Sequence, residues 1–291
     1  MEKTFEQYQK AAEQGDAVAQ SNLGYCYDNG QGVEKDEKQA VYWYKKAAEQ
    51  GDADAQYNLS GCYYDGKGIE KDENQAVYWL KKAAEQGLSH AQNWLGACYE
   101  EGVGVTKDEK QAVYWYNQAA EQGDANAQFN LALCYEDGKG IAKDKKQAVY
   151  WYNQAAEQGY ADAQYNLALC YEYGKGIAKD ETQAAYWYKK AAEQGIANAQ
   201  FNLGTCYFYG NGVAKDEKQA VDWWSKAAEQ GHADAQNSLS SCYYYGYGVT
   251  RDEAQSAYWY KKEIEQRRAD LALSNNNNNV VEEEEEGLAQ L

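Results

Sequence analysis

The stretch QAVYWYKKAAEQG at residues 39–51 decides the fold, because near copies of it recur with a period of 36 residues. One tryptophan and one cysteine keep this spacing in every copy, at Trp43, Trp79, Trp115, Trp151, Trp187, Trp223 and Trp259 and at Cys26, Cys62, Cys98, Cys134, Cys170, Cys206 and Cys242. Self-similarity at a fixed period is the signature of a repeat protein. The 291 residues therefore predict one stack of small units rather than two globular domains.

Each repeat is predicted to be a pair of helices. In the second helix, Asp36 and Gln39 have the spacing of a capping box, and Ala40 and Trp43 begin a stripe of apolar residues at helical spacing. Gly51 then stops the helix, since glycine accepts a left-handed conformation without strain. No segment shows the alternating pattern of a strand, so the sequence predicts an all-α protein.

The first helix of the repeat is predicted over residues 17–29, and the glycine-containing loop GQGV at residues 30–33 joins it to the second. A rotation of about 100° per residue places Leu23 and Cys26 on the core side of this helix. The same rotation places Ser21 and Tyr25 on the opposite side. Stacked helix–turn–helix units of this kind form an α-solenoid.

The predicted layout has four parts. Residues 1–15 form an N-terminal half-repeat helix, so folded structure is expected to begin almost at Met1. Residues 16–267 hold seven repeats, at 16–51, 52–87, 88–123, 124–159, 160–195, 196–231 and 232–267. Arg267 replaces the expected glycine, so the last helix is predicted to run on over 268–274 as a cap. The Asn- and Glu-rich residues 275–291 predict a disordered acidic tail, with a docking motif for a basic partner as the alternative.

The repeated string A-x-A-Q-x-N-L-x-x-C-Y, G-x-G-V/I-x-K-D and Q-A-x-x-W-Y-x-x-A-A-E-Q-G resembles the SEL-one-like repeat (SLR) family, a branch of the tetratricopeptide-like solenoids. The resemblance covers about residues 1 to 268. It implies a right-handed superhelix that acts as an adaptor or scaffold in protein complexes. A secreted, cysteine-rich branch of that family carries two cysteines per repeat in disulfides, whereas this chain has one.

The composition disfavours two classes of partner. Acidic residues number 46 against 28 basic ones, a net charge of −18, whereas nucleic acids and anionic membranes attract positive surfaces. No apolar run is long enough for a membrane span. One cysteine per repeat favours reduced, buried thiols and hence a cytoplasmic location.

No residue pattern predicts catalysis, a metal or a cofactor. The GxG loops lack the third glycine and the Lys-Ser/Thr of phosphate-binding loops, so they are interpreted as hairpin turns. His90 and His232 are the only histidines, and no CxxC motif occurs. The chain is therefore predicted to be no enzyme.

The candidate binding residues are those that differ between repeats on the side of the first helix turned away from the core. In tetratricopeptide-like solenoids that side lines the concave groove. The predicted peptide-binding set is Tyr57, Tyr64, Phe129, Leu133, Glu136, Tyr165, Leu169, Glu172, Phe201, Phe208 and Tyr244. A ladder of amides beside it, Asn22, Asn58, Asn130, Asn166 and Asn202, could hold a peptide backbone or could serve hydrogen bonds between repeats.

The sequence thus predicts a monomeric, non-catalytic scaffold that binds a protein or peptide with basic and apolar residues. A secreted or host-directed effector of the same fold and a regulatory subunit of an enzyme complex are the alternatives. A self-associating structural array is a further one.

Overall fold

The computed structural model describes residues 4–288, and it describes side chains up to residue 273. Helices account for 74% of the chain, and no strand occurs in the described part, which confirms the all-α class. The helices are α1 (Phe5–Glu13), α2 (Ala17–Asn29), α3 (Glu37–Glu49), α4 (Ala53–Asp65), α5 (Glu73–Glu85), α6 (Ser89–Glu101), α7 (Glu109–Glu121), α8 (Ala125–Asp137), α9 (Lys145–Glu157), α10 (Ala161–Tyr173), α11 (Glu181–Glu193), α12 (Ala197–Tyr209), α13 (Glu217–Glu229), α14 (Ala233–Tyr245) and α15 (Glu253–Leu288).

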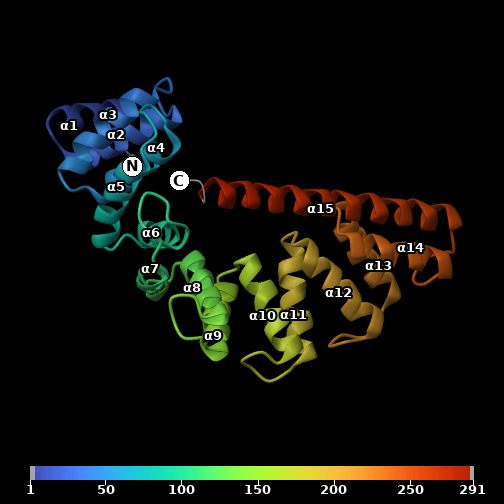
Figure 1. The fold of residues 1–291 in the computed structure, drawn as a ribbon. Helices are drawn as coiled ribbons and strands as arrows, with labels where there is room; N and C mark the ends of the chain where they lie inside the picture. Colours follow the sequence, from blue (N-terminus) through green and yellow to red (C-terminus); the bar gives the residue numbers. More distant parts are fainter. Residues whose placement is uncertain (1–3, 289–291) are drawn as a thin grey trace. The chain divides into compact units, whose positions relative to one another are not determined.

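The chain divides into two compact units, Met1–Gln158 and Gly159–Leu291. Within each unit, consecutive helices form antiparallel pairs that stack on one another (Figure 1). We call the even-numbered helices from α2 to α14 the A helices and the odd-numbered ones the B helices. The superhelical hand stays a prediction.

Local sequence sets the helix ends as predicted. The carboxylate of Asp36 accepts hydrogen bonds from the backbone N–H groups of Lys38 and Gln39, so it caps α3. The second glycine of the GxG loop has a tertiary role, as Gly68 shows. A Cβ on Gly68 would lie 2.2 Å from the carbonyl oxygen of Glu37, so only glycine lets this loop contact the preceding B helix.

Buried glutamines connect the helices of successive repeats. Nε2 of Gln20 in α2 donates to the carbonyl oxygen of Ala12 at 3.0 Å, and its Oε1 accepts from Nε2 of Gln50 at 2.7 Å. We call each such Gln–Gln hydrogen bond a rung. The described rungs are Gln20–Gln50, Gln56–Gln86, Gln92–Gln122, Gln128–Gln158, Gln164–Gln194 and Gln200–Gln230. They satisfy polar groups that would otherwise be costly to bury.

All seven cysteines are buried thiols, as predicted. Burial is the main cause that raises the pKa of Cys134 and Cys242 to about 12. Cys134 and Cys242 lie in core clusters that also contain the fully buried Leu131 and Leu239. The cysteines therefore serve as small core residues.

The last helix differs from the layout predicted for the C-terminus. The backbone of α15 is helical through Leu288, so it passes through residues 268–274 and continues where composition predicts a disordered tail from residue 275. Extending an existing helix needs no new nucleus, and the glutamate run favours helix, which accounts for the difference. Residues 289–291 of the predicted tail lie outside the described residues.

Candidate functional site

The candidate binding face lies on the A helices, at the three positions that residues 21, 25 and 28 hold in the first repeat. We call it the A-helix face. Tyr25 is exposed there as predicted, but Ser21 is only 6% exposed. Position 21 is therefore largely covered in this repeat. A single helical wheel leaves out the A helix of the next repeat, which packs beside this position.

The aromatic residues at position 21 are half-buried, although the sequence placed them away from the core. The ring of Phe129 lies 5.9 Å from that of Tyr152, and the ring of Tyr165 lies 6.0 Å from that of Tyr188. Phe201 packs against the core cluster that α13 and α14 form. These rings therefore fill space between helices rather than stand free on an open groove.

The glutamates at position 28 are already engaged inside the protein. The hydroxyl of Tyr116 donates to Oε2 of Glu100 at 2.7 Å, and that of Tyr152 donates to Oε2 of Glu136 at 2.6 Å. Tyr188 makes the same hydrogen bond to Glu172. Burial, together with the neighbouring carboxylate, raises the pKa of Tyr116, so the hydroxyl stays a donor. Each of these carboxylates already accepts a hydrogen bond from a buried tyrosine, which limits its capacity to bind a ligand.

The sequence carries a signal for these pairs that helical wheels missed. The two partners are 16 residues apart, and the described Tyr–Glu bonds all join position 28 to the B-helix position of Tyr44. Where the B-helix residue is Leu80 or Trp224 instead, position 28 holds Tyr64 or Phe208. Covariation between repeats of the same chain indicates the contact in the middle repeats, although the last repeat holds Tyr244 at position 28 with Tyr260 in the B helix.

The asparagines beside the face bond mainly within the protein. Nδ2 of Asn130 donates to Oδ1 of Asn93 in the preceding repeat at 3.0 Å, and the side chain of Asn202 bonds to Tyr165. Asn22 donates to the carbonyl oxygen of Val18 at 2.7 Å. Asn58 and Asn166 are half-buried. These contacts support the alternative of hydrogen bonding between repeats, and a ladder that holds a ligand stays a prediction.

The rest of the predicted set divides by exposure. Leu133 and Leu169 are half-buried, as is Tyr64, whose ring lies 5.5 Å from that of Trp94. Phe208 is half-buried too, whereas Tyr244 is 49% exposed. The predicted residues thus form one face within each unit, but that face is mostly a packed surface rather than an open groove.

The A-helix face is hollowed in the first repeat. Two adjoining clefts of about 430 and 290 Å³ share Asn22 and Tyr25 in their walls. The smaller cleft is lined by Ser21, which stands where four of the later repeats hold an aromatic ring, and by Asp52 and Asp54. We call these two clefts together the first-repeat cleft. Its walls combine apolar surface, amides and carboxylates.

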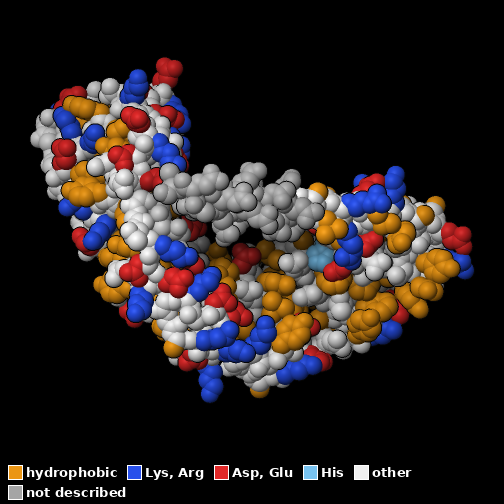
Figure 2. Space-filling view, viewed as in Figure 1, with side chains coloured by type: hydrophobic (Ala, Val, Ile, Leu, Met, Phe, Trp, Pro, Cys, Tyr) orange, Lys and Arg blue, Asp and Glu red, His pale blue; other side chains and the backbone are white. Residues whose placement is uncertain are grey.

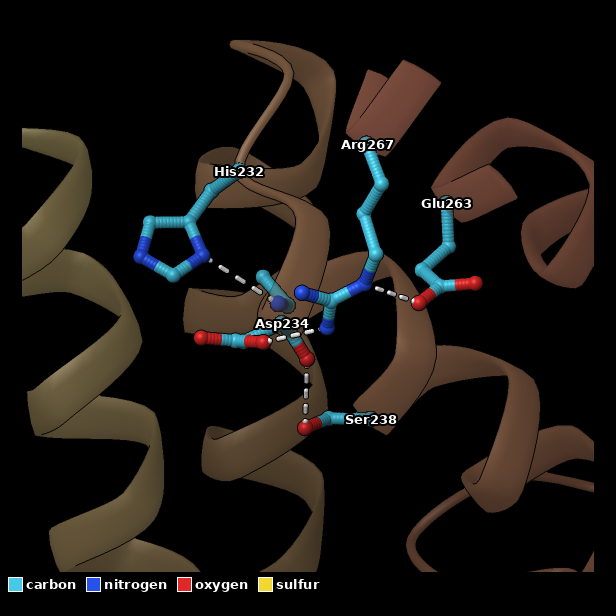
Figure 3. Close-up of polar contacts among 6 residues, drawn as sticks. His232, Asp234, Ser238, Glu263 and Arg267 are labelled. Carbon is cyan, nitrogen blue, oxygen red and sulfur yellow. Dashed lines mark hydrogen bonds and ion pairs between the residues drawn. The ribbon is translucent and has the colours of Figure 1, made fainter. Parts of the chain in front are cut away.

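A second polar cluster lies on the last repeat, where Arg267 of α15 reaches α14 (Figure 3). Its guanidinium donates to Oδ1 of Asp234 at 2.7 Å and to the carboxylate of Glu263. Nδ1 of His232 accepts from the backbone N–H of Ala235 at 3.3 Å, so this histidine caps α14. Burial lowers the pKa of His232, which favours the neutral ring that this cap requires. These contacts join α14 to α15, so the cluster has a structural role.

The sequence pattern of the Sel1 repeat matches almost the whole chain. Its matches cover residues 2–16, 17–52, 53–88, 89–124, 125–160, 161–196, 197–232 and 233–266. The chain belongs to the Sel1 repeat family. After the short first match, the matches begin every 36 residues, from residue 17 to residue 233.

Two solved Sel1 repeat structures are similar over most of the chain. A protective antigen present in uropathogenic Escherichia coli strains, which displays an SLR fold, is 38% identical with a TM-score of 0.89 over 92% of this chain and 58% of that one. The chain thus spans less than two thirds of the length of that protein. A Sel1 repeat protein from Oxalobacter formigenes is 37% identical with a TM-score of 0.72 over 90% of this chain and 75% of that one. Among curated proteins, no relative matches.

Sel1 repeat solenoids are typically non-catalytic scaffolds, and their fold is one used for protein interaction. In the part of the chain that the structure describes, no group of histidine, cysteine or carboxylate side chains could hold a metal ion. No helix within the same residues combines the length and the apolar character needed to span a bilayer.

Proposed function

We propose that this Sel1 repeat protein is a non-catalytic scaffold that holds a segment of a partner protein, and that the first-repeat cleft is the main docking point. One observation carries the proposal. The A-helix face is packed in most repeats, but here it opens into two adjoining clefts with exposed apolar side chains at their rim. Val18 is 62% exposed and Tyr25 is 46% exposed.

The chemistry of the walls suggests the character of the partner. Tyr25 and Val18 offer apolar surface, and tyrosine is among the residues that most often anchor interfaces. Asp52 and Asp54 add carboxylates next to it, in a chain whose net charge is −18. A partner segment with an apolar anchor followed by Lys or Arg complements this combination. The same proposal places the chain in the cytoplasm as a monomer, in keeping with its buried thiols.

A peptide-display selection tests the proposal. Libraries panned on the whole chain should enrich sequences with an aromatic or aliphatic residue close to Lys or Arg. Tyr25→Ala should weaken the enriched peptides by about tenfold or more, since truncating an anchor costs at least 1–2 kcal/mol. Asp54→Asn should weaken them mainly at low salt, because exposed charges are screened.

Tyr114→Ala is the matched control, because this B-helix tyrosine is 52% exposed and lies away from the cleft. It should leave binding unchanged. Peptides that bind equally well to the Tyr25→Ala variant, or that lose binding through Tyr114→Ala, would show that the site is elsewhere.

A further inference from the structure

The second unit carries a continuous aromatic surface where α12 and α14 end. Five rings contact one another in series with centroid distances between 4.8 and 5.7 Å. In order of contact they are Tyr209, Phe208, Tyr247, Tyr245 and Tyr244, and we call them the aromatic platform. Figure 2 shows hydrophobic side chains, a class that includes tyrosine there, gathered on the surface around α12 to α14.

Most of the platform is open to solvent. Tyr209 is 67% exposed and Tyr245 is 63% exposed, while Tyr244 and Tyr247 are 49% and 41% exposed. Phe208 is half-buried and anchors the surface, because its ring also contacts Trp224 at 5.2 Å. Exposed tyrosine rings side by side are costly to leave in water and are typical of interaction surfaces.

The repeat fold does not require aromatic residues at these positions. The first repeat holds Asp28, Asn29 and Gln31 at the corresponding places and folds into the same helix pair. The platform is therefore a property of the last two repeats rather than of the shared core. A role in packing explains Phe208 but leaves the four exposed tyrosines without a structural reason.

The charges around the platform are balanced locally. Arg251 lies over the ring of Tyr244 at 5.5 Å and forms a 2.7 Å ion pair with Glu253. Lys215 lies over the ring of Phe208 at 5.7 Å and pairs with Glu217 at 3.0 Å. Each cation on the surface thus has its own carboxylate. A surface of this kind favours an uncharged ligand over a strongly acidic or basic one.

We propose that the aromatic platform binds a proline-rich segment of a partner protein in the polyproline II conformation. Such a segment is uncharged, presents compact apolar pyrrolidine rings that pack on aromatic faces, and makes no internal hydrogen bonds. Its free carbonyl oxygens therefore need donors, which the tyrosine hydroxyls supply. This combination accounts for the use of tyrosine at four of the five positions. The inference goes beyond the proposed function and uses none of the residues of the first-repeat cleft.

Fluorescence anisotropy with a labelled oligoproline peptide and the whole chain tests the proposal. Oligoproline should bind saturably and at least about tenfold more tightly than a glycine–serine peptide of equal length, which has the same backbone groups but no polyproline II preference. The double variant Tyr209→Ala with Tyr245→Ala should lose at least about tenfold in affinity. Tyr245→Phe, which keeps the ring and removes the donor, should lose less.

Tyr150→Ala is the control, since this tyrosine is 52% exposed but belongs to a B helix of the first unit. It should bind oligoproline like the unmodified chain. So should Tyr25→Ala, so failure at the platform and failure at the first-repeat cleft can be told apart. Circular dichroism checks that the exposed substitutions leave the helices intact.

Three results would overturn the proposal. Oligoproline could fail to bind saturably, could bind no better than the glycine–serine peptide, or could bind the double variant undiminished. Analytical ultracentrifugation adds a further check. Self-association of the unmodified chain that the double variant abolishes would assign the platform to a second copy of this protein instead.

Discussion

The repeat built on α6 and α7 and the repeat built on α12 and α13 fill the same core position in different ways. In the first, Tyr116 fills it and its hydroxyl donates to Glu100 at 2.7 Å. In the second, Trp224 fills it, its Nε1 donates to the carbonyl oxygen of Phe201 at 3.1 Å, and its ring packs on Phe208 at 5.2 Å. Each buried polar atom therefore finds an acceptor, but from a different residue.

This difference changes how variation between repeats is interpreted. Position 28 differs between the two repeats because its partner in the B helix differs. The buried hydroxyl of Tyr116 takes its acceptor from position 28, whereas the indole of Trp224 donates to a backbone carbonyl oxygen instead. Variation on the A-helix face is thus partly a consequence of the core. Only residues that vary without such a partner, such as Tyr25 and the exposed tyrosines of the platform, remain as signs of binding.

The largest expected effect comes from emptying the shared core position. Trp224→Ala should lower the free energy of unfolding by about 3–5 kcal/mol, because it removes a large buried ring and leaves a cavity. Tyr116→Ala should cost a similar amount, since its ring fills the equivalent place. Urea titration followed by circular dichroism measures both. A loss for either variant as small as that for the exposed Tyr150→Ala would show that the two repeats do not depend on this position.

The hydrogen bond itself should give the next largest effect. Glu100→Ala should cost about 1–3 kcal/mol, because it leaves the buried hydroxyl of Tyr116 without its acceptor. Adding Tyr116→Phe should recover part of that loss, since the ring then needs no acceptor. The cycle of single and double variants measures the coupling, with Glu101→Ala as an exposed neighbouring control. Strictly additive losses would contradict the pairing.

Removing a rung glutamine should have a smaller effect on stability, and that effect should differ between an inner repeat and the last repeat. Gln230→Ala should cost about 1–2 kcal/mol, because it removes the donor from the buried oxygen of Gln200. Gln266→Ala at the equivalent position should cost little. Among the described residues Oε1 of Gln236 has no partner, and Nε2 of Gln266 donates to Asp270 at 2.9 Å instead. Equal losses in thermal melts would mean that the last rung forms in solution.

The smallest effect should be a pH dependence confined to the second unit. Burial lowers the pKa of His232 below its ordinary value of 6.5, so the unfolded chain binds more protons than the folded one at acidic pH. Stability from this group should be complete above pH 6.5 and decrease as the pH falls below it. His232→Asp, which copies the caps at Asp16 and Asp52, should reduce this slope in melts between pH 5 and pH 7. An unchanged slope would assign it to other groups.

Much of the fold follows from the sequence because the signals are local and repeated. The capping spacing at Asp36, the glycine at Gly51 and the buried stripe through Trp43 act within one helix pair, and each recurs with the same period. An ambiguous signal in one repeat is therefore resolved by the equivalent residues of the other repeats. The α15 region is the exception, because Arg267 breaks the period and no further copy guides the interpretation.

The binding face was less predictable because its exposure depends on the neighbouring repeat. A helical wheel places Phe129 opposite Leu131, yet the ring of Phe129 contacts Tyr152 across the helix pair. The helical wheel likewise treats Glu136 as a free carboxylate, although the hydroxyl of Tyr152 donates a hydrogen bond to it. Position on one helix is not enough when another helix lies within reach of a long side chain.

The sequence by itself determined the all-α class, the period, the helix ends and the burial of the seven cysteines, since each depends on residues within one repeat. Only the tertiary structure decided which variable residues are free to bind. Contacts between helices fill most of the A-helix face, leave a cleft beside Ser21, and join the exposed tyrosines of the last repeat to Phe208 of the repeat before it. These outcomes depend on side chains that meet across helices, so they follow from the packing of neighbours rather than from the pattern of any one helix.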